Sequence, residues 1–389
     1  MEDQIPKIRF KGAYDENGKW IEFTHPWEQR KLVDYLEVSK NKNKNEAYGK
    51  EDVLSVSGEF GIVNQIEFQG RSFAGASVVN YGVVEVGDIV YTKSPLKSNP
   101  YGIIKTNKGK SGIVSTLYAV YKPKENCDSE FVQTYFELDS RMNSYMHPLV
   151  NKGAKNDMKV SDENALKGSV NFPKFEEQKA ISQYFESLNT LITLHQRKCD
   201  LYQQAKQSMM EKLFSNNVDW EEKQLGEILI RNPKSNIGVH ETQQMKSGDI
   251  PYFTSGEKIF YINDFLVKGE NIFVNDGGVA DIKYYNGKAN YSDHILSLKN
   301  IDNSICLQFV YQSLLSKIKI INDKLFHGLG LKNLSKKDFM NFTISIPDIE
   351  EQIKIANVLS KYDELIAISK NQLDSIKTLK KGLLQQMFI

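Results

Sequence analysis

The stretch FPKFEEQKAI, residues 172–181, returns near the C-terminus as IPDIEEQIKI, residues 346–355. The two copies lie 174 residues apart, counted from Pro173 to Pro347, and align without a gap as far as Phe214 and Phe388. Residues at this offset are called matched below. Each copy begins with proline, which suits the first turn of a helix, and continues with Glu-Glu-Gln, whose acids complement the helix dipole. The repeat therefore predicts two long helices with matched starts.

Apolar residues follow each start in alternating steps of four and three residues, which is coiled-coil spacing held for about five heptads. At about 1.5 Å per residue, each helix would be a rod of roughly 60 Å, which can act as a spacer. Two polar positions of this spacing are also matched, His195 with Ser369 and Lys206 with Lys380, and such positions fix the register of paired helices. A lone His195 matched by serine predicts no metal site. The predicted helix-pairing seam includes Ile181, Phe185, Leu188, Ile192, Ile355, Leu359, Tyr362 and Ile366.

The repetition extends beyond the helices. PWEQRKLVDYL (26–36) is echoed by DWEEKQLGEIL (219–229), and NKGAKNDMKVS (151–161) by FHGLGLKNLS (326–335). The sequences enclosed by these frames show little similarity, which favours two domains that recognise different things on one scaffold. The predicted division is an N-terminal arm (1–24), a globular domain (25–172), a central helix (173–216), a second globular domain (217–346) and a C-terminal helix (347–389).

The globular stretches contain short β-like runs separated by Gly, Asn and Asp, with strands predicted at 87–94, 101–106 and 112–122 and a hairpin turn at Asn286-Gly287. Short helices are predicted near 129–147 and 305–321. We therefore expect an α+β fold, a pseudo-twofold tandem repeat in which two long antiparallel coiled-coil helices separate two globular domains.

Composition restricts the function only loosely. The chain has 389 residues, a net charge of +1, three scattered cysteines and no apolar run long enough to span a bilayer. The first residues lack the apolar core of a secretory signal, so we expect a reduced, cytoplasmic protein with no membrane partner.

No catalytic motif is evident. A phosphate-binding G-x-x-x-x-G-K-[ST] loop is missing, and HGLGLKN (327–333) lacks the third glycine of a dinucleotide site. SNPY (98–101) is similar to the Asn-Pro-Pro-Tyr loop of amino-methyltransferases, but it lacks one proline and no cofactor loop precedes it. We predict no catalytic residue, no metal and no cofactor in this chain.

Residues 89–124 include seven lysines and no Asp or Glu. This run is either a solvated basic face or a surface that contacts phosphates, where lysines gain from counterion release. Asn, Ser and Lys in the connecting loops can also bond base edges. The candidate DNA-binding residues are Lys93, Ser94, Lys97, Asn99, Tyr101, Lys105, Lys108, Lys110, Lys155, Asn156, Lys258, Lys283, Asn286, Lys288, Asn290, Lys332 and Asn333.

The tandem frame strongly resembles the specificity subunit of type I restriction-modification systems. The resemblance is carried by Trp27-Glu28, Trp220-Glu221 and the two Pro…Glu-Glu-Gln helices that end at Phe214 and Phe388. It implies that each globular domain is a target-recognition domain reading one half of a bipartite sequence in double-stranded DNA, and that the paired helices set the gap. It also implies a non-catalytic subunit that docks two adenine methyltransferase (modification) subunits and, in the full complex, restriction/translocase subunits. S-adenosylmethionine, ATP and Mg²⁺ would belong to those partners, and the N-terminal arm would close against the C-terminal helix.

Two other readings remain open at this point. A coiled-coil scaffold whose globular ends bind protein would show weak, salt-insensitive affinity for DNA. A stand-alone DNA methyltransferase would need the cofactor loop that the sequence lacks.

Overall fold

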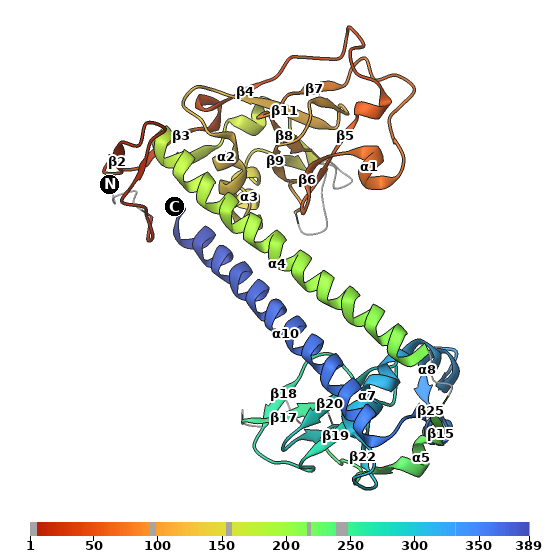
Figure 1. The fold of residues 1–389 in the computed structure, drawn as a ribbon. Helices are drawn as coiled ribbons and strands as arrows, with labels where there is room; N and C mark the ends of the chain where they lie inside the picture. Colours follow the sequence, from red (N-terminus) through yellow and green to blue (C-terminus); the bar gives the residue numbers. More distant parts are fainter. Residues whose placement is uncertain are drawn as a thin grey trace. The chain divides into compact units, whose positions relative to one another are not determined.

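The computed structural model describes residues 6–93, 99–152, 158–215, 219–238, 248–330 and 332–388. They form two compact units: unit 1 runs to Leu194 and resumes at Gln372, and unit 2 comprises His195–Asn371 (Figure 1). Each unit holds one β-rich domain and one part of each long helix, α4 (Phe175–Ser215) and α10 (Ile349–Gln386). The predicted α+β class, with two β-rich domains and two long helices, is confirmed. The five-part division by residue number remains a prediction.

Unit 1 starts with an arm that folds into a short hairpin, followed by the first globular domain. Besides α4, its elements are β1 (Gly12–Tyr14), β2 (Trp20–Glu22), β3 (Glu28–Lys31), β4 (Leu36–Val38), β5 (Leu54–Ser57), β6 (Gly61–Asn64), α1 (Gln65–Gln69), β7 (Gly82–Val84), β8 (Ile89–Thr92), β9 (Ile104–Thr106), β10 (Gly112–Val114), β11 (Tyr118–Pro123), α2 (Ser129–Tyr135), α3 (Asp139–Met146), β12 (Asn151–Lys152), β13 (Met158–Lys159) and β14 (Ser169–Phe172).

Unit 2 contains the second globular domain. Besides the long helices, its elements are β15 (Glu221–Gln224), α5 (Leu225–Ile228), β16 (Leu229–Arg231), β17 (Ile250–Phe253), β18 (Phe260–Ile262), β19 (Glu270–Asn275), β20 (Ile282–Asn286), β21 (Asn290–Tyr291), β22 (Ile295–Asn300), α7 (Leu307–Ser316), α8 (Ile318–Leu325), β23 (Phe326–His327), β24 (Asn333–Leu334), α9 (Lys336–Met340) and β25 (Thr343–Ile346).

The two domains share one sheet topology although their sequences differ. The central antiparallel sheet has the order β4-β11-β8-β9 in unit 1 and β16-β22-β19-β20 in unit 2. In both, the entry strand pairs with the strand before the long helix, β3 with β14 and β15 with β25. The domains differ in what is added: β5, β6, α1, β7 and β10 in unit 1, and the β18-β17-β21 sheet in unit 2. The similarity of the frames therefore extends into the domain cores.

Two local predictions were wrong. Residues 112–122 are not one strand: the chain turns at Ser115, whose carbonyl accepts a 3.0 Å bond from the Tyr118 N–H, and β10 and β11 enter different sheets. Asn286-Gly287 is not a hairpin turn either, because β20 pairs with β19 whereas β21 pairs in parallel with β17. In both places the local turn signal is present, but pairing with distant strands decides where the chain goes.

The matched helix starts make the same hydrogen bonds in both units. Gln178 accepts a hydrogen bond from the Asp128 N–H (3.0 Å) and donates one to the Pro173 carbonyl (3.0 Å). Its match, Gln352, accepts from the Cys306 N–H (2.9 Å) and donates to the Pro347 carbonyl (2.9 Å). Both side chains are buried. The glutamine of each Glu-Glu-Gln triplet thus fastens its long helix to the loop before α2 or α7.

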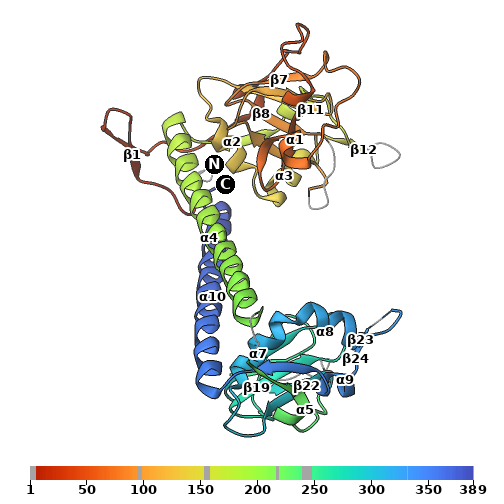
Figure 2. The ribbon, with the colours of Figure 1, turned by 45° about the vertical axis from the view of Figure 1, so that its right-hand side comes forward.

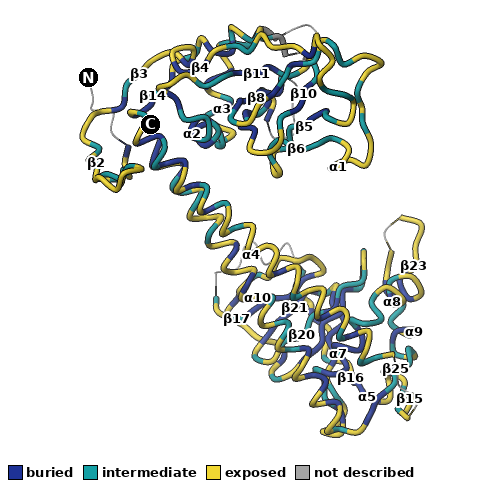
Figure 3. Tube along the Cα trace, turned by 45° about the horizontal axis from the view of Figure 1, so that its top comes forward, coloured by how far each residue is buried: buried dark blue, intermediate teal, exposed yellow. Residues whose placement is uncertain are grey.

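Seam residues lie in the core of each unit. Ile181, Phe185 and Leu188 pack with the first domain and with the end of α10, and Ile355 and Leu359 pack with the second domain. Ile192, Tyr362 and Ile366 are half-buried. Figure 3 shows buried and exposed positions alternating along α4.

An aromatic cluster closes each domain against the last residues of a long helix. Phe388 lies 6.0 Å from Trp27 and 5.7 Å from Phe131, between ring centroids. In unit 2, Phe214 lies 6.2 Å from Trp220 and 5.7 Å from Phe309. Because Trp27 is echoed by Trp220 and Phe214 is matched by Phe388, the same closure is made twice.

The N-terminal arm lies against the end of α10 and the start of α4 (Figure 2). The Ile8 N–H donates a 3.1 Å bond to the Gln386 carbonyl. Arg9 holds both carboxylate oxygens of Glu177 at 2.7 Å, and the Trp27 indole donates to the same carboxylate at 3.2 Å. Hydrogen bonding to Glu177 raises the pKa of Arg9. The arm therefore joins the two ends of the long helices within unit 1. Within the described ranges, no helix is long and apolar enough to cross a membrane.

Candidate nucleic-acid interface

Each domain brings the tip of a central hairpin against the segment that follows its Gly/Lys loop. In unit 1, Lys93 directly follows β8 and forms a 2.8 Å ion pair with Asp162. In unit 2, Asp276 directly follows β19 and forms a 3.0 Å ion pair with Lys336, the residue matched to Asp162. The two domains thus make the same contact with the charges exchanged. At these two hairpin tips, the loops of the two domains occupy equivalent positions but carry different side chains.

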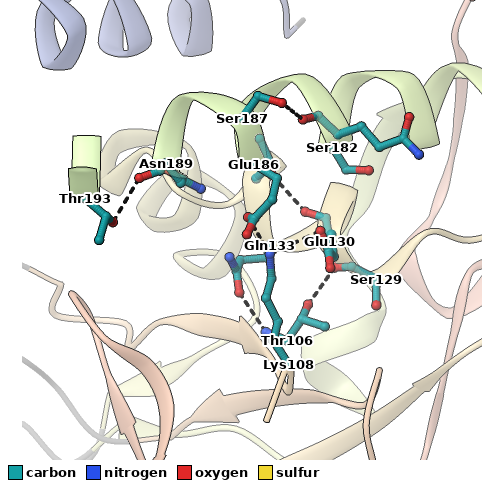
Figure 4. A network of polar contacts seen from close by, with 12 residues as sticks. Thr106, Lys108, Ser129, Glu130, Gln133, Ser182, Glu186, Ser187, Asn189 and Thr193 are labelled. Carbon is teal, nitrogen blue, oxygen red and sulfur yellow. Dashed lines mark hydrogen bonds and ion pairs between the residues drawn. The ribbon is translucent and has the colours of Figure 1, made fainter. Parts of the chain in front are cut away.

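Two predicted lysines of unit 1 lie beside the long helix rather than on an open face. Lys108 forms ion pairs of 3.1 Å with Glu130 on α2 and 2.5 Å with Glu186 on α4 (Figure 4). Burial lowers the pKa of Lys108, but the hydrogen bonds that its ammonium donates to Glu186 and Glu130 outweigh this effect, so the pKa is raised. Lys105, on β9, has its pKa lowered by burial. Lys105 is half-buried, whereas Lys108 and Lys110 are both exposed.

Other unit 1 candidates support the hairpin tip from inside. Asn99 is buried and its carbonyl accepts a 3.0 Å bond from the Gly102 N–H. Tyr101 packs on the domain core, with its ring centroid 6.1 Å from that of His147. Ser94, Lys97, Lys155 and Asn156 lie outside the described residues.

In unit 2, the candidates separate into exposed and enclosed side chains. Lys258 and Lys288 are exposed and lie over the rings of Phe260 and Phe265, at 4.8 and 4.9 Å from the ring centroids. The candidate Asn286, at the end of β20, is also exposed.

Two others are enclosed. Lys283 pairs with Asp281 and donates a 3.2 Å bond to the Gly256 carbonyl. Asn290 is buried, and its amide group bonds the Asp264 carbonyl (3.3 Å) and the Tyr291 N–H (2.8 Å). Asn290 therefore holds β21 in place.

The remaining candidates meet at the β19–β20 tip. Lys332 and Asn333 are exposed, and the Lys332 carbonyl accepts a 2.8 Å bond from the Gly278 N–H. The structure adds two residues that sequence reasoning missed, Lys336 and His294, which approach Asp276 at 3.0 and 3.2 Å. The match of Lys336 to Asp162, with Ser161 and Ser335 just before them, was the available signal. Lys332, Lys336 and His294 thus come from different segments to the same tip.

Comparison with known proteins shows similarity to one family. Residues 217–378 match the family model described as the type I restriction modification DNA specificity domain. A Methanocaldococcus jannaschii protein assigned as the MjaX type I restriction enzyme specificity subunit is 24% identical, over 93% of both chains. The EcoDI specificity subunit of Escherichia coli is 26% identical, over 43% of this chain and 36% of its own.

The fold is also that of a solved structure. The crystal structure of the S subunit of a type I restriction-modification system from M. genitalium superposes with a TM-score of 0.72 and 14% identity, covering 99% of both chains. At that identity the superposition establishes the fold, and the sequence relatives and the family model carry the assignment. Over most of its length in sequence, and over nearly all of it in fold, the chain is therefore similar to the specificity (S) subunits, the DNA specificity components of type I restriction-modification systems.

Proposed function

We propose that this subunit reads a bipartite target in double-stranded DNA, one half-site per globular domain, and that the paired helices set the gap. The observation that carries the proposal is the pair of hairpin tips. Lys93 and Asp162 in unit 1 and Asp276 and Lys336 in unit 2 build the same contact with different chemistry. One frame that presents two unlike loop sets is what reading two unlike half-sites requires.

Among the candidate residues, the exposed lysines are the proposed phosphate contacts. Lys110, Lys258, Lys288 and Lys332 have exposed side chains. Lys108 already faces two glutamates, so its charge is largely compensated within the protein. The residues that discriminate bases are proposed to come from the β8–β9 and β19–β20 connections and from the segments beside the β19–β20 tip. Asn333, bridged to Gly277, and His294, 3.2 Å from Asp276, are the candidates on those segments.

The proposed partners are two methyltransferase subunits, and an exposed apolar stripe on each long helix supports this. Tyr184, Leu191 and Leu194 on α4 are 36%, 40% and 55% exposed, and their matches on α10, Val358, Leu365 and Ile368, are 40%, 38% and 53% exposed. Steps of seven and three residues place each set on one helix face. Two equal apolar stripes, one in each unit, suit two copies of one helical partner.

The catalytic chemistry is proposed to belong to those partners. S-adenosylmethionine would be used by the methyltransferase subunits, and ATP and Mg²⁺ by restriction/translocase subunits in the full complex. Since the proposed ligand is chromosomal DNA, the proposed place of action is the cytoplasm.

The first test is adenine methylation across a host genome with and without this gene, in the presence of the cognate methyltransferase subunit. We expect a split motif that disappears on deletion. A methyltransferase-bound chain that leaves the methylome unchanged and shows only weak, salt-insensitive DNA binding would support the protein-binding scaffold instead.

Docking is tested with matched variants. Leu194→Asp and Ile368→Asp are each expected to reduce the bound methyltransferase from two copies to one, measured by native mass spectrometry. Gln203→Asp, an exposed position outside the stripe, is the charge control. Retention of two copies in both stripe variants would place docking elsewhere.

A further inference from the structure

The two exposed stripes are matched, but the first turns of the two helices differ: the N-terminal arm covers those of α4. In unit 1 the arm lies over the outer face of the first turns of α4. Phe10 meets Tyr184 edge to face at 5.3 Å between ring centroids, and Glu16 pairs with Lys179. The residues matched to this face on α10 include Ile353, matched to Lys179, and it is 46% exposed.

The arm's hairpin is built to project from this face. Asp15 accepts hydrogen bonds from the N–H groups of Asn17 (2.9 Å) and Lys19 (2.8 Å), and Gly18 takes the positive φ of 76° that the turn needs. Tyr14 and Trp20 pack edge to face across the strands, 5.1 Å apart, and both remain exposed. The hairpin is therefore an ordered wall that keeps aromatic surface in solvent.

Between this wall and α4 lies a cavity of about 400 Å³. Its apolar lining includes Ile21 and Phe23 from the arm and Phe175 and Ala180 from α4. Its charged lining residues are Asp15, Glu16, Glu176 and Lys179. Lys179 is the one cationic residue in this described lining and it is paired with Glu16, so Asp15 and Glu176 leave the lining with a net negative charge. The cavity thus suits a short segment with apolar side chains and a Lys or Arg.

The arm adds a wall without closing the stripe. Tyr184 stays 36% exposed beneath Phe10, against 40% for its match Val358. A cover that blocked docking would have buried Tyr184. Unit 1 therefore keeps the exposed stripe found in unit 2 and gains an acidic, apolar-lined groove at its start.

We propose that this groove receives a basic, apolar-sided segment of a methyltransferase subunit, so that the copy docked on the α4 face of unit 1 binds more tightly than the copy docked on the α10 face of unit 2. The inference rests on the proposed function, since it uses the same partner and the same stripes. The N-terminal arm would then give two otherwise matched docking faces different affinities. The face of unit 1 would be occupied before the face of unit 2.

The test is a titration of the full chain with its methyltransferase subunit, followed by native mass spectrometry and isothermal calorimetry. We expect two dissociation constants that differ by roughly tenfold, the difference made by one well-placed anchor. Replacing residues 12–22 with Gly-Gly is expected to weaken the tighter site until the two become equal. The Phe23 N–H and the Lys11 carbonyl already bond at 2.8 Å, so the ends can be joined while Arg9 and Phe10 stay in place.

A milder variant covers the case in which the hairpin replacement disturbs folding. Asp15→Asn with Glu176→Gln keeps hydrogen-bond acceptors and removes charge, and we expect it to weaken only the tighter site, about threefold, with a reduced dependence on salt. Glu350→Gln, matched to Glu176 but without a hairpin beside it, is the control and should change neither constant.

The outcomes separate the two proposals. If the wild-type chain binds no methyltransferase, the proposed function fails. If it binds two copies with equal affinity, or if the hairpin variants leave both constants unchanged or tighten binding, the proposed function stands and this inference is wrong. Ile368→Asp should remove the weaker site and Leu194→Asp the tighter one, and the reverse assignment would also overturn it.

Discussion

Lys380 donates a 2.6 Å hydrogen bond to the side-chain oxygen of Asn189 in unit 1, and their matched residues, Lys206 and Asp363, form a 2.6 Å ion pair in unit 2. In unit 1 the carboxylate that pairs with Lys380 comes from the domain, at Glu137. In unit 2 it comes from the helix, at Asp363, which also accepts a 2.7 Å bond from Gln312 of the domain. Each half-buried or buried ammonium thus has a carboxylate next to it, supplied from opposite sides. These lysines tie both long helices to the domain of their unit.

This arrangement predicts that the carboxylate beside Lys206 in unit 2 can be moved from the helix to the domain. Asp363→Asn removes the carboxylate beside the buried Lys206 and should destabilise unit 2 by about 1–2 kcal/mol, a moderate cost because Asp363 is partly exposed. Adding Gln312→Glu rebuilds the unit 1 pattern and should restore part of the loss. Urea denaturation of both variants and of Gln312→Glu alone gives the coupling energy. A coupling indistinguishable from zero would contradict the prediction.

The contact between the arm and Glu177 predicts a larger loss of stability in unit 1 when it is removed. Arg9→Ala leaves the Glu177 carboxylate buried, with the Trp27 indole as its one remaining side-chain donor among the described residues, and should cost about 3 kcal/mol. Glu351→Gln, at the matched but exposed position, should stay within about 0.5 kcal/mol. With Trp20 and Trp220 replaced by Phe, the fluorescence of Trp27 reports urea unfolding of unit 1. Equal, small effects of both substitutions would mean that the arm does not hold this site.

Sequence reasoning reached the parts of the fold that depend on local pattern. The heptad spacing and the two Pro…Glu-Glu-Gln starts predicted long helices, and the structure gives α4 and α10. The echo of Trp27 by Trp220 marked equivalent positions, which the aromatic clusters around Phe388 and Phe214 explain. Matched residues were informative because a duplicated contact preserves its residue types.

Sequence reasoning failed where distant strands decide. The common sheet order of the two domains was not visible, because short strands keep a topology with many different apolar sequences. The Lys93–Asp162 and Asp276–Lys336 contacts were hidden for another reason: exchanging the two charges preserves the ion pair and removes the sequence similarity. A run of lysines likewise could not show that Lys108 faces two glutamates.

The placement of the lysines predicts unequal effects on DNA binding. Lys332→Ala removes an exposed charge at the β19–β20 tip and should lower affinity for all sequences, with the slope of log K against log salt reduced by about 1. Lys108→Ala should leave both nearly unchanged, since Glu130 and Glu186 already compensate its charge. Fluorescence anisotropy over a salt series measures both. If Lys108→Ala lowered the affinity more than Lys332→Ala, the DNA surface would instead lie on the α2–α4 side of unit 1.

Lys105 predicts a dependence of stability on pH. Burial lowers its pKa in the folded state below the ordinary 10.5, with Lys380 and Lys108 adding repulsion and Glu137 opposing it. Between the folded pKa and 10.5 the unfolded chain therefore binds more protons, so this group makes folding more favourable as pH rises through that window. Lys105→Met should stabilise unit 1 at neutral pH, and the gain should shrink toward pH 10.5. A gain that does not change with pH would show that packing, not charge, is responsible.

The last prediction concerns the helices as spacers. Inserting seven residues into α4 and seven into α10, after Leu194 and before Gln372, keeps the seam spacing because one full heptad is added. The added length is about 10 Å, and at about 3.4 Å per base pair the gap in the target should grow by about three base pairs. Methylome sequencing should show both half-sites unchanged. A four-residue insertion, which rotates the seam, should lower the stability of the helix pair and serves as the control. If the seven-residue insertion left the gap unchanged, the helices would not be what sets the gap.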